Sequence, residues 1–269
     1  MPENRVKITV EDHVAEVALV RGEMHNALDG EMFEAIAGAA GRLSSEPGLR
    51  AVILHGEGPS FCSGIDVGWL AGGEAEGFGE HARKRDSFGA NLFQRVATAW
   101  IEVPVPVIAS IHGNCLGGGL QIALGSDLRI TSPDAKLSVR EVHWGLVPDM
   151  GITATLPRLL ALDVAKELTF TGQVISGEEA VRLGLATRAE TDPLAAARSL
   201  AAEIARRSPD AVRAAKQLFD KSWPGAGPSG LELESELQFE LIGSPNQMAA
   251  VTAGITGDPG EFNDPDPPG

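Results

Sequence analysis

Three segments of this 269-residue chain combine residue types that could do chemistry. The first, FCSGIDV at residues 61–67, directly follows a strand-like stretch and its loop. Small residues around Gly64 allow a tight turn whose backbone N–H groups stay unpaired, and such groups can bind an anion or a developing oxyanion. Taken alone, the segment is explained more simply by an ordinary glycine turn.

The second segment, GNCLGGG at residues 113–119, lies between a predicted strand and a predicted helix. Its three consecutive glycines would expose backbone N–H groups at a helix N-terminus, where the helix dipole favours negative charge. No Lys-Ser or Lys-Thr pair follows and the spacing does not match GxGxxG, so neither a P-loop nor a dinucleotide site is indicated. Close helix packing that requires glycine explains the same residues equally well.

The third segment, REVHWGLVPDMG at residues 140–151, carries two carboxylates, Glu141 and Asp149. They flank apolar residues and a turn that contains glycine and proline. In an apolar pocket one of these carboxylates would have a raised pKa and could transfer protons. The alternative is a surface ion pair between Glu141 and Arg140.

Composition and charge narrow the classes of function. The net charge of −15 disfavours generic binding to nucleic acids or anionic membranes, and no apolar run approaches the roughly 18–20 residues of a membrane span. Residues 1–5 are polar and unlike a signal peptide. Cys62 and Cys115 form no CxxC pair, and free thiols indicate a reducing cytoplasm. The histidines lack metal-ligand spacing, so no metal is expected, and a Cys62 nucleophile assisted by His25 or His112 has little support.

The elements that must position these segments alternate between strand and helix. Residues 7–10 and 14–20 are predicted to form a hairpin, and a helix is expected from residue 26 to about residue 43, with Asp29 as its N-cap. The other strands predicted in this half are 51–54, 106–111, 128–130 and 136–139, and the other helices are 90–103 and the stretch from the glycines to about residue 125.

Helices dominate the second half, where they are predicted near residues 152–161, 163–170, 177–184, 193–206, 208–222 and 230–242. We therefore predict an α/β core at residues 1–200 and a helical region at 201–257. The Pro/Asp-rich tail at 258–269 is expected to be disordered. Residues 71–89, rich in glycine and charge, indicate a mobile surface loop.

Taken in order, these segments resemble the crotonase (enoyl-CoA hydratase/isomerase) superfamily over nearly the whole chain. The stretches that carry the resemblance are residues 21–28, SFCSGIDV at 60–67, IHGNCLGGGLQIALGSDLRI at 111–130, LSVREVHWGLVPDMG at 137–151, LPRLLALDVAKELTFTG at 156–172 and SGEEAVRLGLA at 176–186. The resemblance implies a crotonase-like spiral of ββα units with a C-terminal α-helical trimerisation region, assembled as a homotrimer or a dimer of trimers. It also implies an acyl-CoA substrate and no further cofactor.

By the family's pattern, the two oxyanion-hole N–H donors fall on Ile65 and Gly118, where they would polarise the thioester carbonyl and stabilise the adjoining enolate. Each such donor is typically worth about 3–4 kcal/mol. The resemblance makes Glu141 and Asp149 the catalytic carboxylates, and the backbone around Asp66 is expected to line the nucleotide. The substrate-binding positions that it implies are Met24, Ala27, Ser63, Gly64, Asp66, Val67, Gly117, Gln121 and Arg140.

The sequence departs from the family's hydratases, which carry two catalytic glutamates. The second falls on Glu141, but the first falls on Gln121, which can only form hydrogen bonds, for example to water or to Glu141. Single-glutamate isomerases of the family keep only the equivalent of Glu141. Its dienoyl-CoA isomerases carry an acid at the position of Asp149, but they also carry an aspartate where Gln121 stands. Glu23 occupies a position where many members have a lysine near CoA.

We therefore expect a soluble cytoplasmic enzyme that shifts double bonds in enoyl- or dienoyl-CoA. Glu141 would remove an α or γ proton, and Asp149 would return or relay one. Two alternatives stay open. One is a 2-enoyl-CoA hydratase with Glu141 as the surviving carboxylate, and the other is a catalytically weak acyl-CoA-binding paralogue, which Gln121 motivates. An RNA-binding role has no basic stretch to support it.

Overall fold

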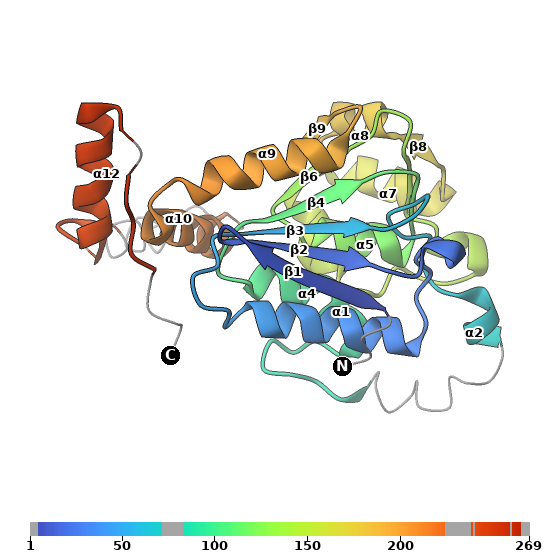
Figure 1. The fold of residues 1–269 in the computed structure, drawn as a ribbon. Coiled ribbons are helices and arrows are strands. Elements are labelled where there is room, and N and C mark those ends of the chain that lie inside the picture. The colour runs from blue at the N-terminus through green and yellow to red at the C-terminus, as the bar shows by residue number, and fades with distance from the viewer. Residues whose placement is uncertain (1–4, 72–82, 224–237, 239, 259, 265–269) are drawn as a thin grey trace.

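The computed structural model describes residues 5–71, 83–223, 238, 240–258 and 260–264 (Figure 1). Most of the predicted loop at 71–89 and most of the predicted helix at 230–242 lie outside the described residues. The same holds for residues 265–269 of the predicted tail and for residues 1–4. The predicted mixed α/β architecture is confirmed, whereas the ββα spiral and the trimerisation region stay predictions.

The larger sheet has the strand order β1-β2-β3-β4-β6-β9. Its strands are β1 (Val6–Glu11), β2 (Val14–Leu19), β3 (Ala51–Gly56), β4 (Val107–Ile111), β6 (Leu128–Thr131) and β9 (Arg188–Ala189). The predicted hairpin is confirmed, because β1 and β2 pair antiparallel with Val6 opposite Leu19. The remaining neighbours pair in parallel, and β3 and β4 are buried throughout, as expected for parallel strands covered on both faces.

A smaller sheet has the order β5-β7-β8, with β5 at Asn114–Leu116, β7 at Lys136–Ser138 and β8 at Ile175–Ser176. β5 pairs in parallel with β7, and β8 pairs antiparallel to it. β5, β8 and β9 were not predicted from the sequence. These elements have only two or three residues, which is too short for a period-two pattern to be visible.

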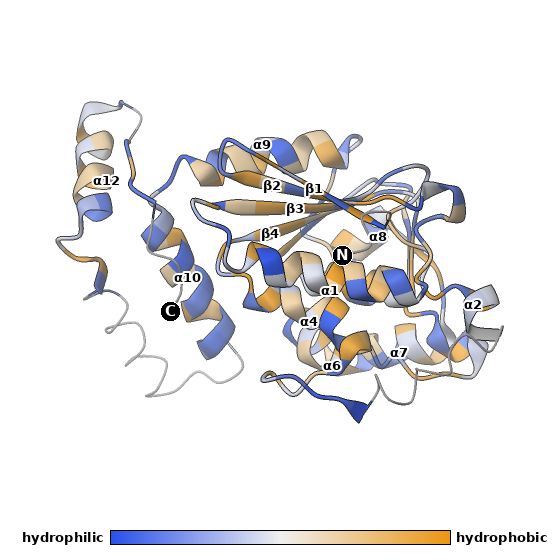
Figure 2. Cartoon of the chain, turned by 60° about the horizontal axis from the view of Figure 1, so that its bottom comes forward, coloured by the Kyte–Doolittle hydropathy of each residue, from blue (hydrophilic) through white to orange (hydrophobic). Residues whose placement is uncertain are grey.

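Helices cover both faces of the larger sheet, with α9 (Pro193–Ala205) on one side and α1 (Gly30–Leu43) and α4 (Leu92–Glu102) on the other (Figure 1). Alternate residues of β3 divide accordingly. Val52 and Leu54 belong to the main core with α1 and α4, whereas Ala51 and Ile53 pack against α9. Figure 2 shows apolar residues in the strands of the sheet and in the helices that flank it, and the buried residues of α1 and α4 are nearly all apolar.

The start of α1 confirms a local prediction. Asp29 is its N-cap and accepts a hydrogen bond from the Met32 N–H at 2.9 Å. A corresponding cap at Asn91 begins α4. The helix α5 (Gly118–Leu124) follows the glycine run, as predicted.

The second half is helical, with α7 at Leu162–Thr171, α8 at Gly177–Leu183, α10 at Pro209–Ser222 and α12 at Pro245–Thr256. The predicted helix at 152–161 is wrong. The chain forms the short α6 (Ile152–Thr155) and then a 3-10 turn, η4 (Leu156–Arg158), because Pro157 cannot donate the next helical hydrogen bond. The sequence analysis also missed α12, which stands apart from the sheet beside α10 (Figure 1).

Part of the predicted tail contacts the folded chain. The Asn263 N–H donates to the Asn246 side chain at the start of α12, and Arg50 donates to the carbonyl of Phe262.

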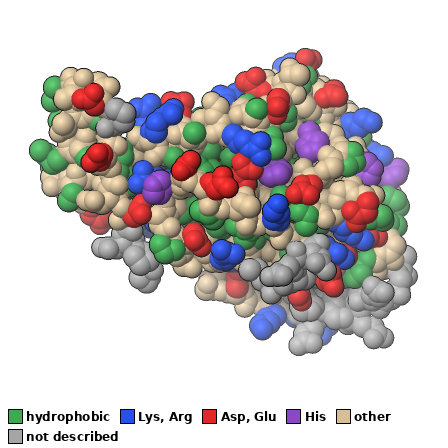
Figure 3. All heavy atoms as spheres, viewed as in Figure 1, with side chains coloured by type: hydrophobic (Ala, Val, Ile, Leu, Met, Phe, Trp, Pro, Cys, Tyr) green, Lys and Arg blue, Asp and Glu red, His purple; other side chains and the backbone are tan. Residues whose placement is uncertain are grey.

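On the face shown in Figure 3, acidic and basic side chains are interspersed with apolar ones. Among the described residues, no helix is both long and apolar enough to cross a membrane.

Candidate active site

The two glycine turns lie directly against each other. Cys62 bridges Cys115, and Leu28 bridges Ile65 in the same strand-like manner. Gly64 has a φ of +91°, and a β-carbon there would lie 2.7 Å from the Leu116 carbonyl oxygen. Only glycine allows both this conformation and this approach. The same absent β-carbon would lie 3.6 Å from the Gly118 nitrogen, so the two segments form one surface.

The backbone N–H groups of Ile65 and Gly118 lie at this contact, and neither has an acceptor among the described residues. The Leu28 N–H bonds to the Gly64 carbonyl and the Asp66 N–H to the Leu28 carbonyl, which leaves the intervening Ile65 N–H unused. Gly118 is the first residue of α5, so its N–H has no intrahelical partner. Gly117 makes the turn into α5 at a φ of +51°, which favours glycine. The pair can therefore donate to an external oxygen atom.

A pocket of about 420 Å³ opens over these N–H groups. It brings together twelve of the thirteen residues predicted for the site, and the exception is Gln121, which is fully buried behind the pocket. The residues brought together are Met24, Ala27, Ser63, Gly64, Ile65, Asp66, Val67, Gly117, Gly118, Arg140, Glu141 and Asp149. Residues that the sequence analysis did not assign to the site also line it, namely Gly68, Trp144, Leu146, Val147 and Met150. Four of these lie within residues 140–151, the segment that carries both carboxylates. Their closeness to Glu141 and Asp149 in the sequence could have identified them as pocket residues.

Glu141 begins the 3-10 turn η3 (Glu141–Trp144), and its side chain is buried at the pocket. Its Oε1 accepts a hydrogen bond from Gln121 Nε2 at 2.5 Å. Its Oε2 is buried and has no hydrogen-bond partner among the described residues. Burial raises the pKa of Glu141, and the nearby Asp149 carboxylate raises it further, while the Gln121 hydrogen bond opposes the rise. Such a group is suited to accept and release a proton.

The sequence also allowed a surface ion pair between Glu141 and Arg140, but the described structure does not contain it. Arg140 Nη1 donates instead to the Gly172 carbonyl at 2.7 Å. Asp149 lines the same pocket as Glu141 but stays accessible to solvent. Partial burial raises the pKa of Asp149 as well. The pocket therefore holds two carboxyl groups that protonate more readily than ordinary ones.

Arg21 connects the loops on the other side of the pocket, a role the sequence analysis did not predict. Its Nη1 donates to the Ala27 carbonyl at 2.9 Å, and its Nη2 forms an ion pair with Asp66 at 2.8 Å. Asp66 also accepts from the N–H groups of Gly68 and Trp69 at the start of α2 (Val67–Ala71). Although partial burial opposes the shift, the bonds from Trp69 and Arg21 hold the pKa of Asp66 below its usual range.

The structure gives no support to a cysteine nucleophile. Cys62 and Cys115 are both buried, and burial raises the pKa of Cys62 to about 12. His25 bonds to the Ser60 hydroxyl and His112 to the Gly58 carbonyl, so neither hydrogen-bonds to Cys62. Within the described ranges no group of three His, Cys, Asp or Glu side chains is placed to hold a metal ion.

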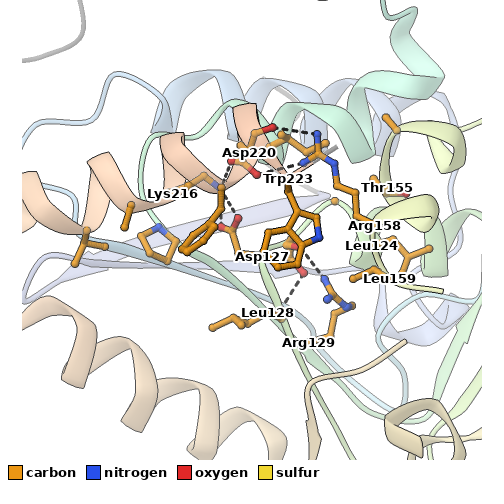
Figure 4. A pocket seen from close by; sticks show the side chains of 18 of the residues that line it. Leu124, Asp127, Leu128, Arg129, Thr155, Arg158, Leu159, Lys216, Asp220 and Trp223 are labelled. Carbon is orange, nitrogen blue, oxygen red and sulfur yellow. Dashed lines mark hydrogen bonds and ion pairs between the residues drawn. The ribbon is translucent and has the colours of Figure 1, made fainter. Parts of the chain in front are cut away.

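A second cavity, of about 440 Å³, lies under α10 (Figure 4). Its two carboxylates, Asp127 and Asp220, are paired with cations. Lys216 Nζ lies 2.5 Å from Asp127 Oδ2, and Arg158 bonds to Asp220 at 3.3 Å. Arg129 donates to the carbonyls of Leu185 and Ser126. These contacts join α10 to the core.

Comparisons with known proteins identify the family of this chain. The sequence profile of the enoyl-CoA hydratase/isomerase family matches residues 9–255. A short-chain-enoyl-CoA hydratase of Clostridium acetobutylicum is 32% identical over 255 residues, covering 94% of this chain and 95% of that protein. A mitochondrial Delta(3,5)-Delta(2,4)-dienoyl-CoA isomerase of Rattus norvegicus is 34% identical over 215 residues, covering 77% of this chain and 66% of that protein.

The crystal structure of an enoyl-CoA hydratase from Bacillus anthracis is similar to this chain with a TM-score of 0.87 and 29% sequence identity. The match covers 96% of this chain and 98% of that one. The chain belongs to the enoyl-CoA hydratase/isomerase family, and the resemblance to the crotonase superfamily is confirmed.

Proposed function

We propose that this protein shifts a double bond in an enoyl- or dienoyl-CoA thioester, with Glu141 as the principal base. The observation that carries the proposal is the state of the Glu141 carboxylate. Glu141 lines the pocket, its Oε1 accepts from Gln121, and its Oε2 is buried without a partner among the described residues. A glutamine cannot exchange a proton at neutral pH, so the paired glutamates of the family's hydratases are not both available here.

In the proposed mechanism the thioester carbonyl oxygen binds between the N–H groups of Ile65 and Gly118. These donors stabilise the enolate that forms when a proton leaves the neighbouring carbon, and each is worth about 3–4 kcal/mol. Glu141 removes the α or γ proton, and the electron pair moves into the enolate. A proton then returns at the other end of the shifted double bond, either from Glu141 itself or from Asp149. In the second case Asp149 is protonated before the reaction, and the proton held by Glu141 passes back to Asp149 through solvent before the next turnover. The reaction consumes no water.

The raised pKa values of the two carboxyl groups support these roles. A carboxylate with an ordinary pKa is a weak base at neutral pH, and burial makes it a stronger one. Glu141 is the more buried of the two and is therefore assigned the proton removal. Asp149 remains accessible at the same pocket and is assigned the proton return at a distant carbon.

Hydration of 2-enoyl-CoA is the second candidate, because the Clostridium acetobutylicum relative is named as a hydratase. In that case Glu141 alone would activate the water. A binding-only function is less well supported, since a buried carboxylate oxygen left without a partner costs stability and is not needed for binding.

A panel of 2-enoyl-, 3-enoyl- and 3,5-dienoyl-CoA substrates, followed by absorbance and mass, tests the proposal. Isomerisation changes the absorbance without changing the mass, whereas hydration adds the mass of one water. We expect the 3-enoyl or 3,5-dienoyl substrates to give products of unchanged mass. A product that gains water from 2-enoyl-CoA, with no isomerisation, would establish the hydratase. Binding without turnover would favour the acyl-CoA-binding alternative.

We also propose a cytoplasmic homotrimer or dimer of trimers that needs no cofactor besides its thioester substrate. The support for assembly is a set of large exposed apolar side chains on the C-terminal helices, which partner copies would cover. These are Phe219 and Trp223 at α10 and Met248 and Ile255 on α12. Light scattering at micromolar concentration tests the assembly, and a monomeric mass would contradict it.

A further inference from the structure

Gln121 is fully buried on α5 and uses both ends of its amide. Its Oε1 accepts from the Met150 N–H at 2.9 Å, and its Nε2 donates to Glu141 Oε1 at 2.5 Å. A backbone N–H can only donate, so it fixes which end of the amide faces Met150. The NH₂ group must then face Glu141. The direction of this hydrogen-bond chain is set by the backbone.

This chain makes the two oxygens of Glu141 unequal. Oε1 receives the Gln121 hydrogen, which favours the ionised carboxylate, while Oε2 stays without a partner among the described residues. The hydrogen bond from Gln121 therefore fixes the orientation of the carboxyl group at the pocket that Glu141 lines. The same hydrogen bond limits the rise in the pKa of Glu141 that burial and the Asp149 carboxylate cause.

Gln121 also holds the neighbouring parts of the site. The Met150 N–H belongs to the peptide bond that directly follows Asp149, so the bond to Gln121 anchors the loop that carries the second carboxylate. Met150 in turn packs on the turn at Gly118, where an added β-carbon would lie 2.7 Å from the Met150 sulfur. One amide thus connects the base, the Asp149 loop and the turn of Gly118.

From these contacts we infer that Gln121 is a positioning residue, which orients the Glu141 carboxyl group and anchors the loop that carries Asp149. The inference deepens the proposed function and rests on it for the identity of the base. Gln121 has no exposed surface, so it offers no second group to hold a water molecule in the pocket. The site is thereby assigned to enoyl-CoA substrates that exchange protons rather than to those that add water.

Gln121→Met removes both hydrogen bonds at nearly constant length and tests the inference. A hydrogen bond to a charged group shifts an equilibrium by about 10- to 100-fold, here the ionisation of the Glu141 carboxyl group. Its loss should therefore raise the pKa of Glu141 by about one to two units. The acidic limb of the profile of kcat against pH should move up by the same amount, with KM changed little. A merely structural role would lower the activity equally at every pH.

Gln121→Glu gives a second and distinct signature. A protonated glutamic acid at position 121 can still donate to Glu141, but two ionised carboxylates at this distance repel each other. In the wild type, the titration of Glu141 should produce only an acidic limb in the profile of kcat against pH. In Gln121→Glu, the same profile should also descend at higher pH. Gln94→Met is the matched control, because the Gln94 side chain accepts from the Asn91 N–H at the start of α4 and lies outside the pocket. It should leave the profile in place.

The pKa of Glu141 is also to be measured without substrate, by carboxyl infrared titration against Glu141→Gln. A pKa unchanged in Gln121→Met, in a variant whose Tm shows that it is folded, would overturn the inference. The same pH profiles can be recorded with a hydratable substrate. A hydratase whose Glu141 pKa still depends on Gln121 would therefore refute the proposed isomerisation while keeping the positioning role.

Discussion

The pocket at the glycine turns and the cavity under α10 have similar volumes, about 420 and 440 Å³, and charged side chains line both. They differ in how those charges are paired. Under α10, Lys216 lies between Asp127 and Asp220, and Arg158 also bonds to Asp220 (Figure 4). At the glycine turns, by contrast, the buried Oε2 of Glu141 has no partner within the described structure.

The comparison separates groups that stabilise the fold from groups that are available for chemistry. A fully paired cluster holds its elements together and has no free acceptor for a substrate proton. An unpaired buried oxygen costs stability, and such costs are characteristic of functional sites. Cavity volume alone would have selected the slightly larger cavity, whose two described carboxylates, Asp127 and Asp220, are both paired with cations.

The largest expected effect is that of Glu141→Gln, which keeps the size and the hydrogen bonding but removes the basicity. The turnover rate should fall by about 100- to 10,000-fold, while the affinity for acyl-CoA changes little. Steady-state kinetics with the best substrate of the panel measures both quantities. Turnover within a few-fold of the wild type would mean that the base is another residue.

Lys216→Met tests the other side of the comparison. It leaves Asp127 and Asp220 as neighbouring carboxylates without their shared cation. We expect the free energy of unfolding to fall by about 1.5–3 kcal/mol, as for the loss of a hydrogen bond to a charged group. The kcat of the folded variant should stay near that of the wild type. Denaturant unfolding and kinetics on the same preparation check this, and a loss of kcat without a loss of stability would reverse the assignment of the two cavities.

Asp149→Asn should slow the isomerisation of dienoyl substrates more than that of simple 3-enoyl substrates, because proton return at a distant carbon is its proposed role. General acid–base assistance is worth about 100-fold at its lower end, and we expect the dienoyl effect to be of that order. Parallel kinetics on the two substrates give the ratio. Equal losses on both would argue against a role at the distant carbon.

The smallest expected effect concerns pH. Glu141 must be ionised to act as a base, so activity should fall as the pH drops through its pKa, which burial and Asp149 raise above the ordinary glutamate value of about 4.3. Removing the charge of Asp149 should therefore move this acidic limb to lower pH. The limb is read from kcat in the wild type and in Asp149→Asn. A limb that moves upward would contradict the electrostatic account.

Much of the site could be predicted from the sequence because its parts are local. The turns around Gly64 and Gly118 and the carboxylates of Glu141 and Asp149 each lie in a short segment with a readable pattern. The sequence could not show whether Glu141 pairs with Arg140 or faces a pocket, since that depends on where the Gly172 carbonyl lies. That carbonyl belongs to the residue that ends α7, about thirty residues further along the chain.

The features that were missed depend on contacts between distant segments. Nothing in the spacing indicates that Gln121 accepts from the Met150 N–H, or that Arg21 joins Ala27 to Asp66. The cluster under α10 likewise unites Asp127 with Lys216, which are far apart in the chain. Secondary structure was predicted wrongly where the strands are very short, as in β8 and β9, and where Pro157 interrupts a helical pattern.

The most direct test of the account compares two rates on one enzyme preparation, the conversion of 3-enoyl-CoA to 2-enoyl-CoA and the hydration of 2-enoyl-CoA. Mass and absorbance are followed in the wild type and in Glu141→Gln. We predict that isomerisation is the faster reaction in the wild type and that it collapses in Glu141→Gln. Hydration that exceeds isomerisation, or isomerisation that survives the loss of the Glu141 carboxylate, would contradict the account.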